Sequence, residues 1–445
     1  MDVFVAAIGF ALAGTLVGSV TGLVPGIHVN TIAAWAIATH LSFSSWASGL
    51  LGISSPDSLI VLSAFLASTM ISHEFTEIIP SVFIGAPEPD SSLTVYPGHR
   101  LLRKGLGYQA IVASASGTLV GALAALVLII PLRFVMGPPL NGYEIAEPAI
   151  PYILIIIVIL IVMLERRTNF NERWYARATA LGVFLASGVF GQLTLNSGGL
   201  PIPSEQILFP MFTGLFGIST LLFSLKGEEG RIPAQKTVSI KQAMDSIRFE
   251  KGRTSKTFIS SLSGALVSFF PGVSGAQATS VANVLTGGDA SEPRSYIYHI
   301  SAIKISASIF SLMALFTILK GRSGVAVAIS SMFPSLETWS SVSEPPEMML
   351  LILVAMVLAL ALSFFILLSV GNVVARNAHK LKPKPLSIVV VAFLIALVGL
   401  FTGPFGLAIL AIATCVGLLA PILGVSRVHL MGVLIVPVIM YYFTM

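Results

Sequence analysis

Two stretches of this chain share one local pattern, and each interrupts a long apolar segment. Residues 18–31 read Gly-Ser-Val-Thr-Gly-Leu-Val-Pro-Gly-Ile-His-Val-Asn-Thr, and residues 264–277 read Gly-Ala-Leu-Val-Ser-Phe-Phe-Pro-Gly-Val-Ser-Gly-Ala-Gln. Proline lacks a backbone N–H and glycine tolerates unusual dihedral angles, so a helix stops at Pro-Gly. At membrane depth such a break is tolerated only where it is buried in protein or lines a water-filled cavity.

The composition indicates that both breaks lie in a polytopic membrane protein. Of 445 residues, 55% are hydrophobic and 10% are charged, and the mean hydropathy is +0.92. A soluble domain carries about 25% charged residues. The net charge of +5 does not indicate a nucleic-acid partner, because the basic residues fall in loops, as they do in membrane proteins. The single cysteine excludes an intrachain disulfide and a multi-cysteine metal site.

The apolar segments predict an all-α polytopic membrane protein with about 10–12 transmembrane helices. Basic loops near residues 100–104, 166–177, 226–256 and 376–384 alternate with loops that carry acidic residues. This charge pattern predicts a multi-pass protein of the cytoplasmic membrane, with the basic loops in the cytoplasm and both termini outside. Lys320 and Arg322 do not fit the pattern.

The repeated pattern also predicts the domain organisation. We expect a first membrane repeat over residues 1–225, a cytoplasmic linker over 226–256 and a second membrane repeat over 257–445. The first repeat would begin outside and the second in the cytoplasm, so the two repeats would be inverted relative to each other. Each would carry a Pro-Gly helix break or a re-entrant hairpin.

Polar residues beside the two breaks are the first candidate site. Hydroxyls, amides and helix N-termini can hold an anion, whereas carbonyls freed at a break could hold a cation. A single break could be only a kinked helix, but two in corresponding positions point to the binding site of a transporter. The expected substrate-binding frame consists of Pro25, Gly26, His28, Asn30, Thr31, Pro271, Gly272, Ser274 and Gln277.

Lys304 is the second candidate, because it lies in the middle of an apolar segment with Ser301 and Ser308 on the same helical face. A buried ammonium is costly in a membrane and normally faces a cavity or a partner. It could neutralise a bound carboxylate, or act as a proton or charge carrier that replaces a metal ion. The alternative is a side chain that snorkels to the interface.

His73, Glu74 and Glu77 form the third candidate, since they share one helical face. We expect them to act as a coupling site or proton relay. The prolines and glycine that follow, up to residue 90, predict a re-entrant hairpin over 71–90. An interfacial loop with solvated acids is the alternative. No metal site is expected, because the spacing lacks a His-Glu-x-x-His pattern.

Several function classes lack their motifs. The chain has no P-loop, no Gly-x-Ser-x-Gly elbow and no dinucleotide fingerprint, so we expect neither ATP-driven transport nor an enzyme. An intramembrane enzyme acting through His73 and its neighbours lacks a nucleophile–base pair. No catalytic residue is predicted, and no cofactor beyond a coupling Na+ or H+.

Five segments resemble the TctA-type permeases, the large membrane subunit of tripartite tricarboxylate transporters, and especially their shorter archaeal relatives. They are residues 14–26, Ile-Gly-Ala-Pro at 84–87, Tyr-Pro-Gly-His-Arg-Leu-Leu-Arg-Lys-Gly-Leu-Gly at 96–107, Phe-Thr-Gly-Leu-Phe-Gly-Ile-Ser at 212–219, and Pro-Gly-Val-Ser at 271–274. The resemblance runs along residues 10–310. It implies a permease, and it suggests an elevator motion and a homodimer. A small membrane subunit and an extracytoplasmic binding protein serve as partners in tripartite relatives. Many family members carry a Glu and paired Asn where this chain has Lys304 and its serines.

We therefore expect a secondary active transporter that moves an organic anion, such as a di- or tricarboxylate, by cation- or proton-coupled alternating access. Lys304 would be the charge partner of the anion. The alternative is a flippase for a polyprenyl-phosphate lipid carrier, because inverted repeats and half-helix N-termini also suit a phosphate head group. Arg100, Arg103 and Arg294 would then bind the phosphate. Membrane lipids and this ligand are the partners that the residues themselves indicate, and no nucleic-acid partner is expected.

Overall fold

The computed structural model describes residues 2–24, 27, 29–85, 94–163, 165, 170–195, 204–225, 232–239, 241–242, 253–269, 292–380 and 382–444. These residues form an all-α protein without a β-strand. The elements are α1 (Val3–Leu23), α2 (Val29–Leu51), α3 (Ser55–Thr76), α4 (Ile78–Phe83), α5 (Val95–Arg103), α6 (Gly107–Met136), α7 (Gly142–Ala146), η2 (Glu147–Ala149), α8 (Ile150–Met163), α9 (Phe170–Leu195), α10 (Ser204–Phe212), η3 (Thr213–Ile218), α11 (Ser219–Leu225), α13 (Arg253–Phe269), α15 (Pro293–Thr317), α16 (Gly324–Met332), α17 (Glu347–Asn377), η4 (Ala378–Lys380), α18 (Pro383–Leu423), η5 (Arg427–Met431) and α19 (Gly432–Thr444).

The long helices have the length and composition of membrane spans. In the described part of the chain, nine of them contain at least 18 residues and are apolar enough to cross a bilayer. A shorter apolar helix covers Ile207–Phe223. The prediction of an all-α polytopic membrane protein is confirmed.

The helix that leads to the first Pro-Gly pair ends where the sequence predicts, since α1 ends at Leu23, two residues before Pro25. The chain resumes as α2 at Val29. Helix α13 is described up to Phe269, and the second Pro-Gly pair lies outside the described residues. Most of the expected binding frame lies outside the described residues, namely Pro25, Gly26, His28, Pro271, Gly272, Ser274 and Gln277.

The re-entrant hairpin predicted over residues 71–90 is described only up to Gly85, so it stays a prediction. Helix α3 continues unbroken to Thr76, and α4 follows after the single turn residue Glu77. Together they form one candidate span, Ser55–Phe83. Pro80 does not end the helical path, because it lies in the first turn of α4, where its missing N–H is tolerated. The predicted return segment, residues 86–93, lies outside the described residues.

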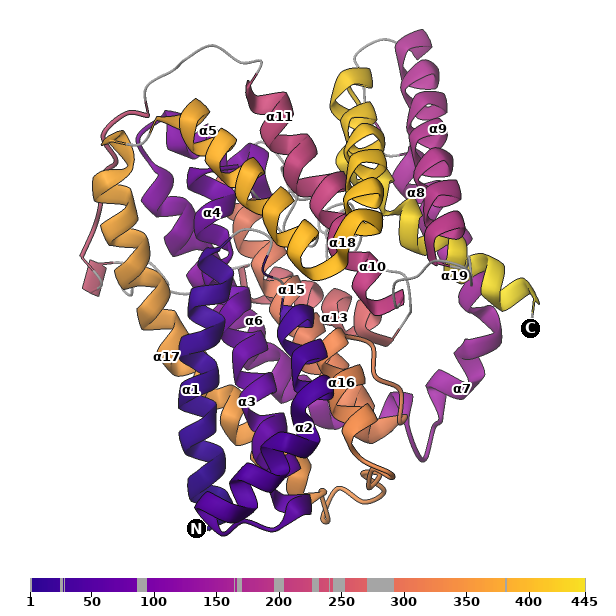
Figure 1. Cartoon of the computed structure of the whole chain (residues 1–445). Helices are drawn as coiled ribbons and strands as arrows, with labels where there is room; N and C mark the ends of the chain where they lie inside the picture. The colour runs from indigo at the N-terminus through magenta and orange to yellow at the C-terminus, as the bar shows by residue number, and fades with distance from the viewer. Residues whose placement is uncertain are drawn as a thin grey trace.

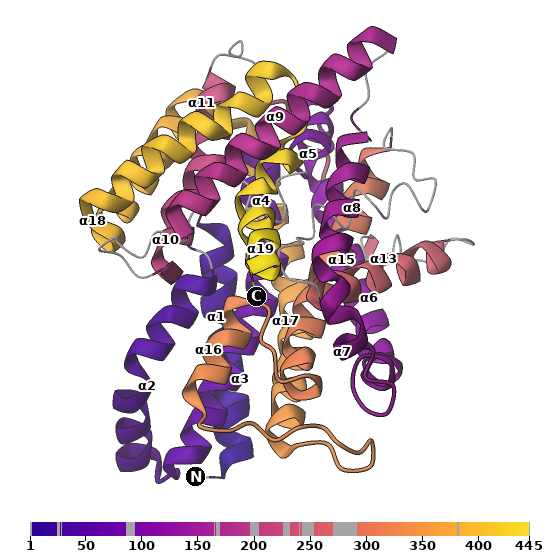
Figure 2. The same cartoon turned by 90° about the vertical axis from the view of Figure 1, so that its right-hand side faces the viewer.

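The helices are arranged around two large apolar cores, and both halves of the chain contribute to each. The first core takes side chains from α2–α6, α13 and α15–α17, and the second from α7–α10, η3, α18, η5 and α19. Figure 1 shows the indigo helices α1–α3 beside orange α16 and α17, with magenta α9 beside yellow α18 at the upper right. Figure 2 shows α9 and α18 together again, above α1–α3. Ala314 of α15 and Phe269 of α13 extend into the second core, so α13 and α15 bridge the two.

Glycines bring α1 against α3 and α13 against α15 in the same way. A Cβ atom at Gly18 of α1 would lie 2.2 Å from the Thr69 carbonyl oxygen of α3, and one at Gly264 of α13 would lie 2.6 Å from the Ile303 carbonyl oxygen of α15. In each pair the next contact, at 2.9 and 2.8 Å, is the Cβ of a serine three residues further along. Close backbone approach at small residues is how helices associate in membranes.

This packing predicts that an added methyl group disrupts both helix pairs. Gly18→Ala and Gly264→Ala should each lower the free energy of unfolding by about 1–3 kcal/mol, because the backbones must move apart. Gly9→Ala is the matched control, since a Cβ there meets nothing within 4 Å. Thermal unfolding of the purified variants measures the effect. Equal melting temperatures for all three variants would contradict the account.

Candidate functional site

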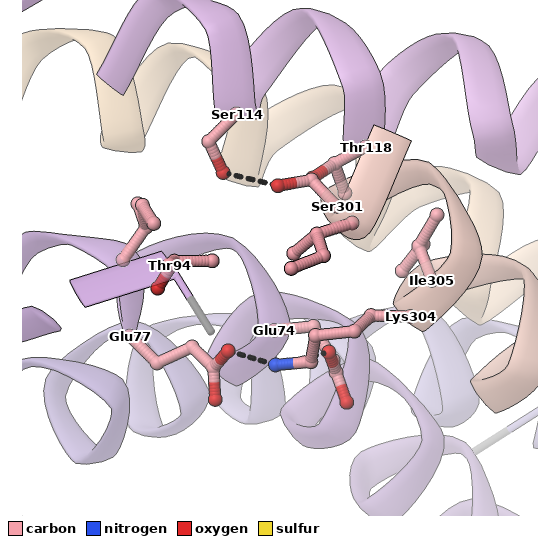
Figure 3. Close-up of a pocket in the computed structure, with 10 residues that line it drawn as sticks. Glu74, Glu77, Thr94, Ser114, Thr118, Ser301, Lys304 and Ile305 are labelled. Carbon is pink, nitrogen blue, oxygen red and sulfur yellow. Dashed lines mark hydrogen bonds and ion pairs between the residues drawn. The ribbon is translucent and has the colours of Figure 1, made fainter. Parts of the chain in front are cut away.

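A buried ion cluster lies where α3 meets α15 (Figure 3). The Lys304 ammonium of α15 forms an ion pair with the Glu77 carboxylate, and its Nζ lies 3.2 Å from Oε2 of Glu74. The Lys304 side chain is 7% exposed and that of Glu77 is 6% exposed. A charge at this depth costs several kcal/mol unless it is paired. The two carboxylates supply that pairing, and they contribute one more negative charge than Lys304 balances.

The neighbouring serines of α15 connect the cluster to α3 and α6. Ser308 donates a hydrogen bond of 3.0 Å to Oε1 of Glu74. Ser301, on the same face of α15, lies 2.9 Å from the hydroxyl oxygen of Ser114 on α6. The polar face of α15 that the sequence indicates is therefore turned toward other helices and not toward lipid.

His73 extends the cluster toward α1. Its Nε2 lies 4.0 Å from Oε2 of Glu77, and its Nδ1 lies 3.0 Å from the Thr21 hydroxyl oxygen. The Thr21 hydroxyl oxygen also lies 3.1 Å from the Gly18 carbonyl oxygen, so it is hydrogen-bonded within α1 as well as to His73. This arrangement leaves Nε2 directed at Glu77. The cluster thus reaches the end of α1 next to the first Pro-Gly break.

A small polar cavity opens beside the ion cluster. Its empty volume is about 260 Å³, counting the open space at its mouth. Glycines on two helices hold its α15 wall in place, because a Cβ at Gly117 would lie 2.1 Å from the Tyr298 carbonyl oxygen and one at Gly264 would meet Ile303. The cavity is lined by Glu74, Glu77, Ile78, Thr94, Ser114, Thr118, Ile300, Ser301, Lys304 and Ile305.

With this geometry established, the comparisons with known proteins are informative. The chain matches the tripartite tricarboxylate transporter TctA family over residues 8–432. The protein belongs to the TctA family. An uncharacterized protein of Methanocaldococcus jannaschii is 28% identical over 441 residues, which cover 97% of this chain and 98% of that protein. This near full-length match agrees with the archaeal branch that the sequence resembles.

A second relative is more distant. An uncharacterized 52.8 kDa protein of Agrobacterium vitis is 24% identical over 240 residues, which cover 52% of this chain and 43% of that protein. No solved structure matches the chain. The TctA family and the helical membrane fold point to a component of a membrane transporter rather than to an enzyme.

The structure brings together two sets of residues that the sequence indicated separately. Lys304 and Glu77 lie 227 positions apart in the chain and form one ion pair. Lys304 does not snorkel, and Glu77 is not a solvated acid, because both side chains are buried. The Lys304 charge is paired within the protein, and its role as the partner of a substrate anion stays a prediction. Whether the cluster couples an ion stays a prediction.

Three hydroxyl residues of the cavity were missed by sequence reasoning. Thr94 precedes α5, and Ser114 and Thr118 lie one helical turn apart on α6. Ser114 and Thr118 are polar residues at i and i+4 in an otherwise apolar span, and that spacing could have indicated a polar face. For Thr94 the sequence offers no comparable signal, because its position depends on how the chain enters α5.

The remaining predicted residues lie elsewhere. Asn30 and Thr31 fall in the first turn of α2, and a Cβ at Gly324, the first residue of α16, would lie 2.3 Å from the Asn30 side chain. The first turns of α2 and α16 therefore lie side by side. The three arginines of the flippase alternative do not line the cavity; all are exposed, two on α5 and one near the start of α15, namely Arg100, Arg103 and Arg294.

Lys320 and Arg322, which do not fit the alternation of basic and acidic loops, both have partners in the structure. Lys320 forms an ion pair with Glu147, and Arg322 donates a hydrogen bond to the Tyr143 hydroxyl. The Lys320 ammonium also lies 4.8 Å from the centre of the Tyr143 ring. These basic residues join the α15–α16 connection to α7 and η2, so their positions follow local pairing and not the rule for loops.

The cluster predicts a large cost for removing its cation. Lys304→Met should lower the free energy of unfolding by about 3–5 kcal/mol, because two buried carboxylates lose their partner. Lys320→Met removes a half-exposed ion pair and should cost at most about 1 kcal/mol.

Thermal or chemical unfolding of the purified variants tests this difference. Lys304→Met combined with Glu77→Gln should recover part of the loss, because one carboxylate no longer needs a partner. Equal losses for the two lysine variants would show that Lys304 is not held by a buried pair.

Proposed function

We propose that the protein is a secondary active transporter that moves a small organic anion, in particular a di- or tricarboxylate, across the cytoplasmic membrane. Transport would be coupled to a cation or proton gradient by alternating access. The buried Lys304–Glu74–Glu77 cluster is the observation that carries the proposal. Ionisable residues inside a membrane are costly and mark substrate or ion pathways, and this cluster borders a cavity where helices from both halves of the chain meet.

The proposal assigns the anion and the coupling ion to neighbouring places. The substrate anion would bind beside the first Pro-Gly break, where the first turns of α2 and α16 lie side by side and the positive ends of two helix dipoles favour an anion. The acidic cluster would bind the coupling ion, because two carboxylates and one ammonium repel a second anion. His73 connects the two places through Thr21 at the end of α1.

The two apolar cores support an elevator-type movement as the form of alternating access. Each core takes helices from both halves of the chain, as rigid bodies built from inverted repeats would. The core that contains α3 would carry the substrate past the core that contains α9 and α18, and the contacts of Phe269 and Ala314 with the second core would break during the movement. The Lys320–Glu147 pair lies between these bodies and would separate during the movement. A second copy of the chain or the small membrane subunit of a tripartite system would bind the stationary core.

Uptake by proteoliposomes tests the proposal. The purified protein should accumulate one or a few labelled di- or tricarboxylates when a sodium or proton gradient is imposed, and empty liposomes should not. No uptake of any acid in the panel, together with thermal stabilisation by a polyprenyl phosphate, would contradict the proposal and support the lipid flippase.

A charge substitution tests the assigned anion site. Asn30→Asp should reduce carboxylate uptake at low substrate concentration about tenfold or more, because a like charge beside the helix N-termini repels the anion by more than about 1.4 kcal/mol. Asn377→Asp makes the same chemical change on an exposed turn at the end of α17 and should leave uptake unchanged. Equal uptake by both variants would place the anion elsewhere.

A further inference from the structure

The Lys304 ammonium sits between two carboxylates as a bound cation would. It pairs with Glu77 and lies 3.2 Å from Glu74, and the two glutamates stand three residues apart on the same face of α3. The lysine side chain comes from a different helix and reaches this position from the opposite side (Figure 3). The positive charge therefore comes from α15, and the two carboxylates that pair with it come from the end of α3 and the turn that follows it.

The atoms around this position are oxygens. Ser308 holds Glu74 by a hydrogen bond of 3.0 Å, and the hydroxyls of Thr94, Ser114 and Ser301 line the adjoining cavity. Carboxylate and hydroxyl oxygens are the donors that hard metal cations prefer. An ammonium group needs the same acceptors, because it has three N–H donors and no lone pair. The cluster therefore offers one set of ligands that suits either kind of cation.

We propose that Lys304 occupies a site for a monovalent metal cation of the Na+ class, and that a shorter neutral side chain opens this site to Na+. The two carboxylates would then share one cation in both the wild-type and the substituted protein. The Lys304 stem is buried, so its removal leaves room beside the existing cavity for an ion and a water molecule. This proposal of Na+ binding rests on the geometry of the ion cluster and does not depend on the proposed transport function.

The position of Lys304 also limits which ion can drive transport, and this step rests on the proposed function. A tethered ammonium cannot leave with the substrate, so the wild-type chain would not use Na+ at this position. Of the two coupling ions considered, the proton would remain. Transport by the wild-type protein should then respond to an imposed proton gradient and not to replacement of Na+ by choline.

Thermal unfolding of the full-length purified protein tests the binding claim without any transport assay. Lys304→Ala is compared with wild type at pH 8 in NaCl and in choline chloride of equal ionic strength. The melting temperature of Lys304→Ala should rise saturably with NaCl, by about 3 °C or more, whereas wild type should melt alike in both salts. Lys320→Ala, on the exposed ion pair, should also melt alike in both.

A second variant identifies the ligands. Lys304→Ala combined with Glu77→Gln should lose the response to NaCl, because one of the two carboxylates is gone. If the vacated carboxylates take up a proton or water instead, Lys304→Ala melts alike in NaCl and choline chloride, and the proposal is wrong. A specific response to NaCl in the wild-type protein would also overturn it.

If Lys304→Ala is too unstable for a melting temperature to be measured, the yield of folded protein tests the proposal instead. Membranes that contain the variant are solubilised and purified in parallel in NaCl and in choline chloride. Recovery of monodisperse protein only in NaCl supports the proposal. Failure to recover it in either salt overturns it, because a filled cation site would restore the lost pairing.

Discussion

The cost of a buried charge in a membrane is the constraint on which the rest of this structure depends. Lys304 lies in the middle of α15, where its ammonium is buried, and it is paired there with two carboxylates, Glu74 of α3 and Glu77 of the turn that follows α3. Because the pair must stay closely matched, α3 and α15 are fixed relative to each other at this depth. Ser308 donates a hydrogen bond to Glu74, and Ser301 bonds to Ser114, so side-chain hydrogen bonds link α15 to α3 and to α6 beside the ion pair.

Close helix packing surrounds the buried charges of the cluster. Gly18 and Gly264 let α1 and α13 approach the backbones of α3 and α15, and Gly117 of α6 closes the other side of α15. These close backbone contacts and the side chains of Ile78, Ile300 and Ile305 surround the small cavity beside the cluster.

Much of this architecture can be predicted from the sequence, but the pairing cannot. Composition and the position of Pro25 predict the helical membrane fold and the end of α1. Lys304 and Glu77 each attract attention because charges are rare in apolar segments. Their contact is not predictable from one sequence, since it depends on how two helices 227 positions apart cross. The sequence also does not show that Pro80 falls in a first helical turn, because a periodicity argument does not locate that turn.

The central claim is that the cluster couples an ion while the anion binds beside it, and a paired assay of Glu77→Gln in proteoliposomes tests this most directly. Exchange of labelled for unlabelled carboxylate needs only the anion site, whereas accumulation against a concentration gradient also needs coupling. We predict that the variant retains exchange and loses gradient-driven accumulation. Accumulation equal to that of the wild-type protein would contradict the account, because the buried carboxylate would then have no part in coupling.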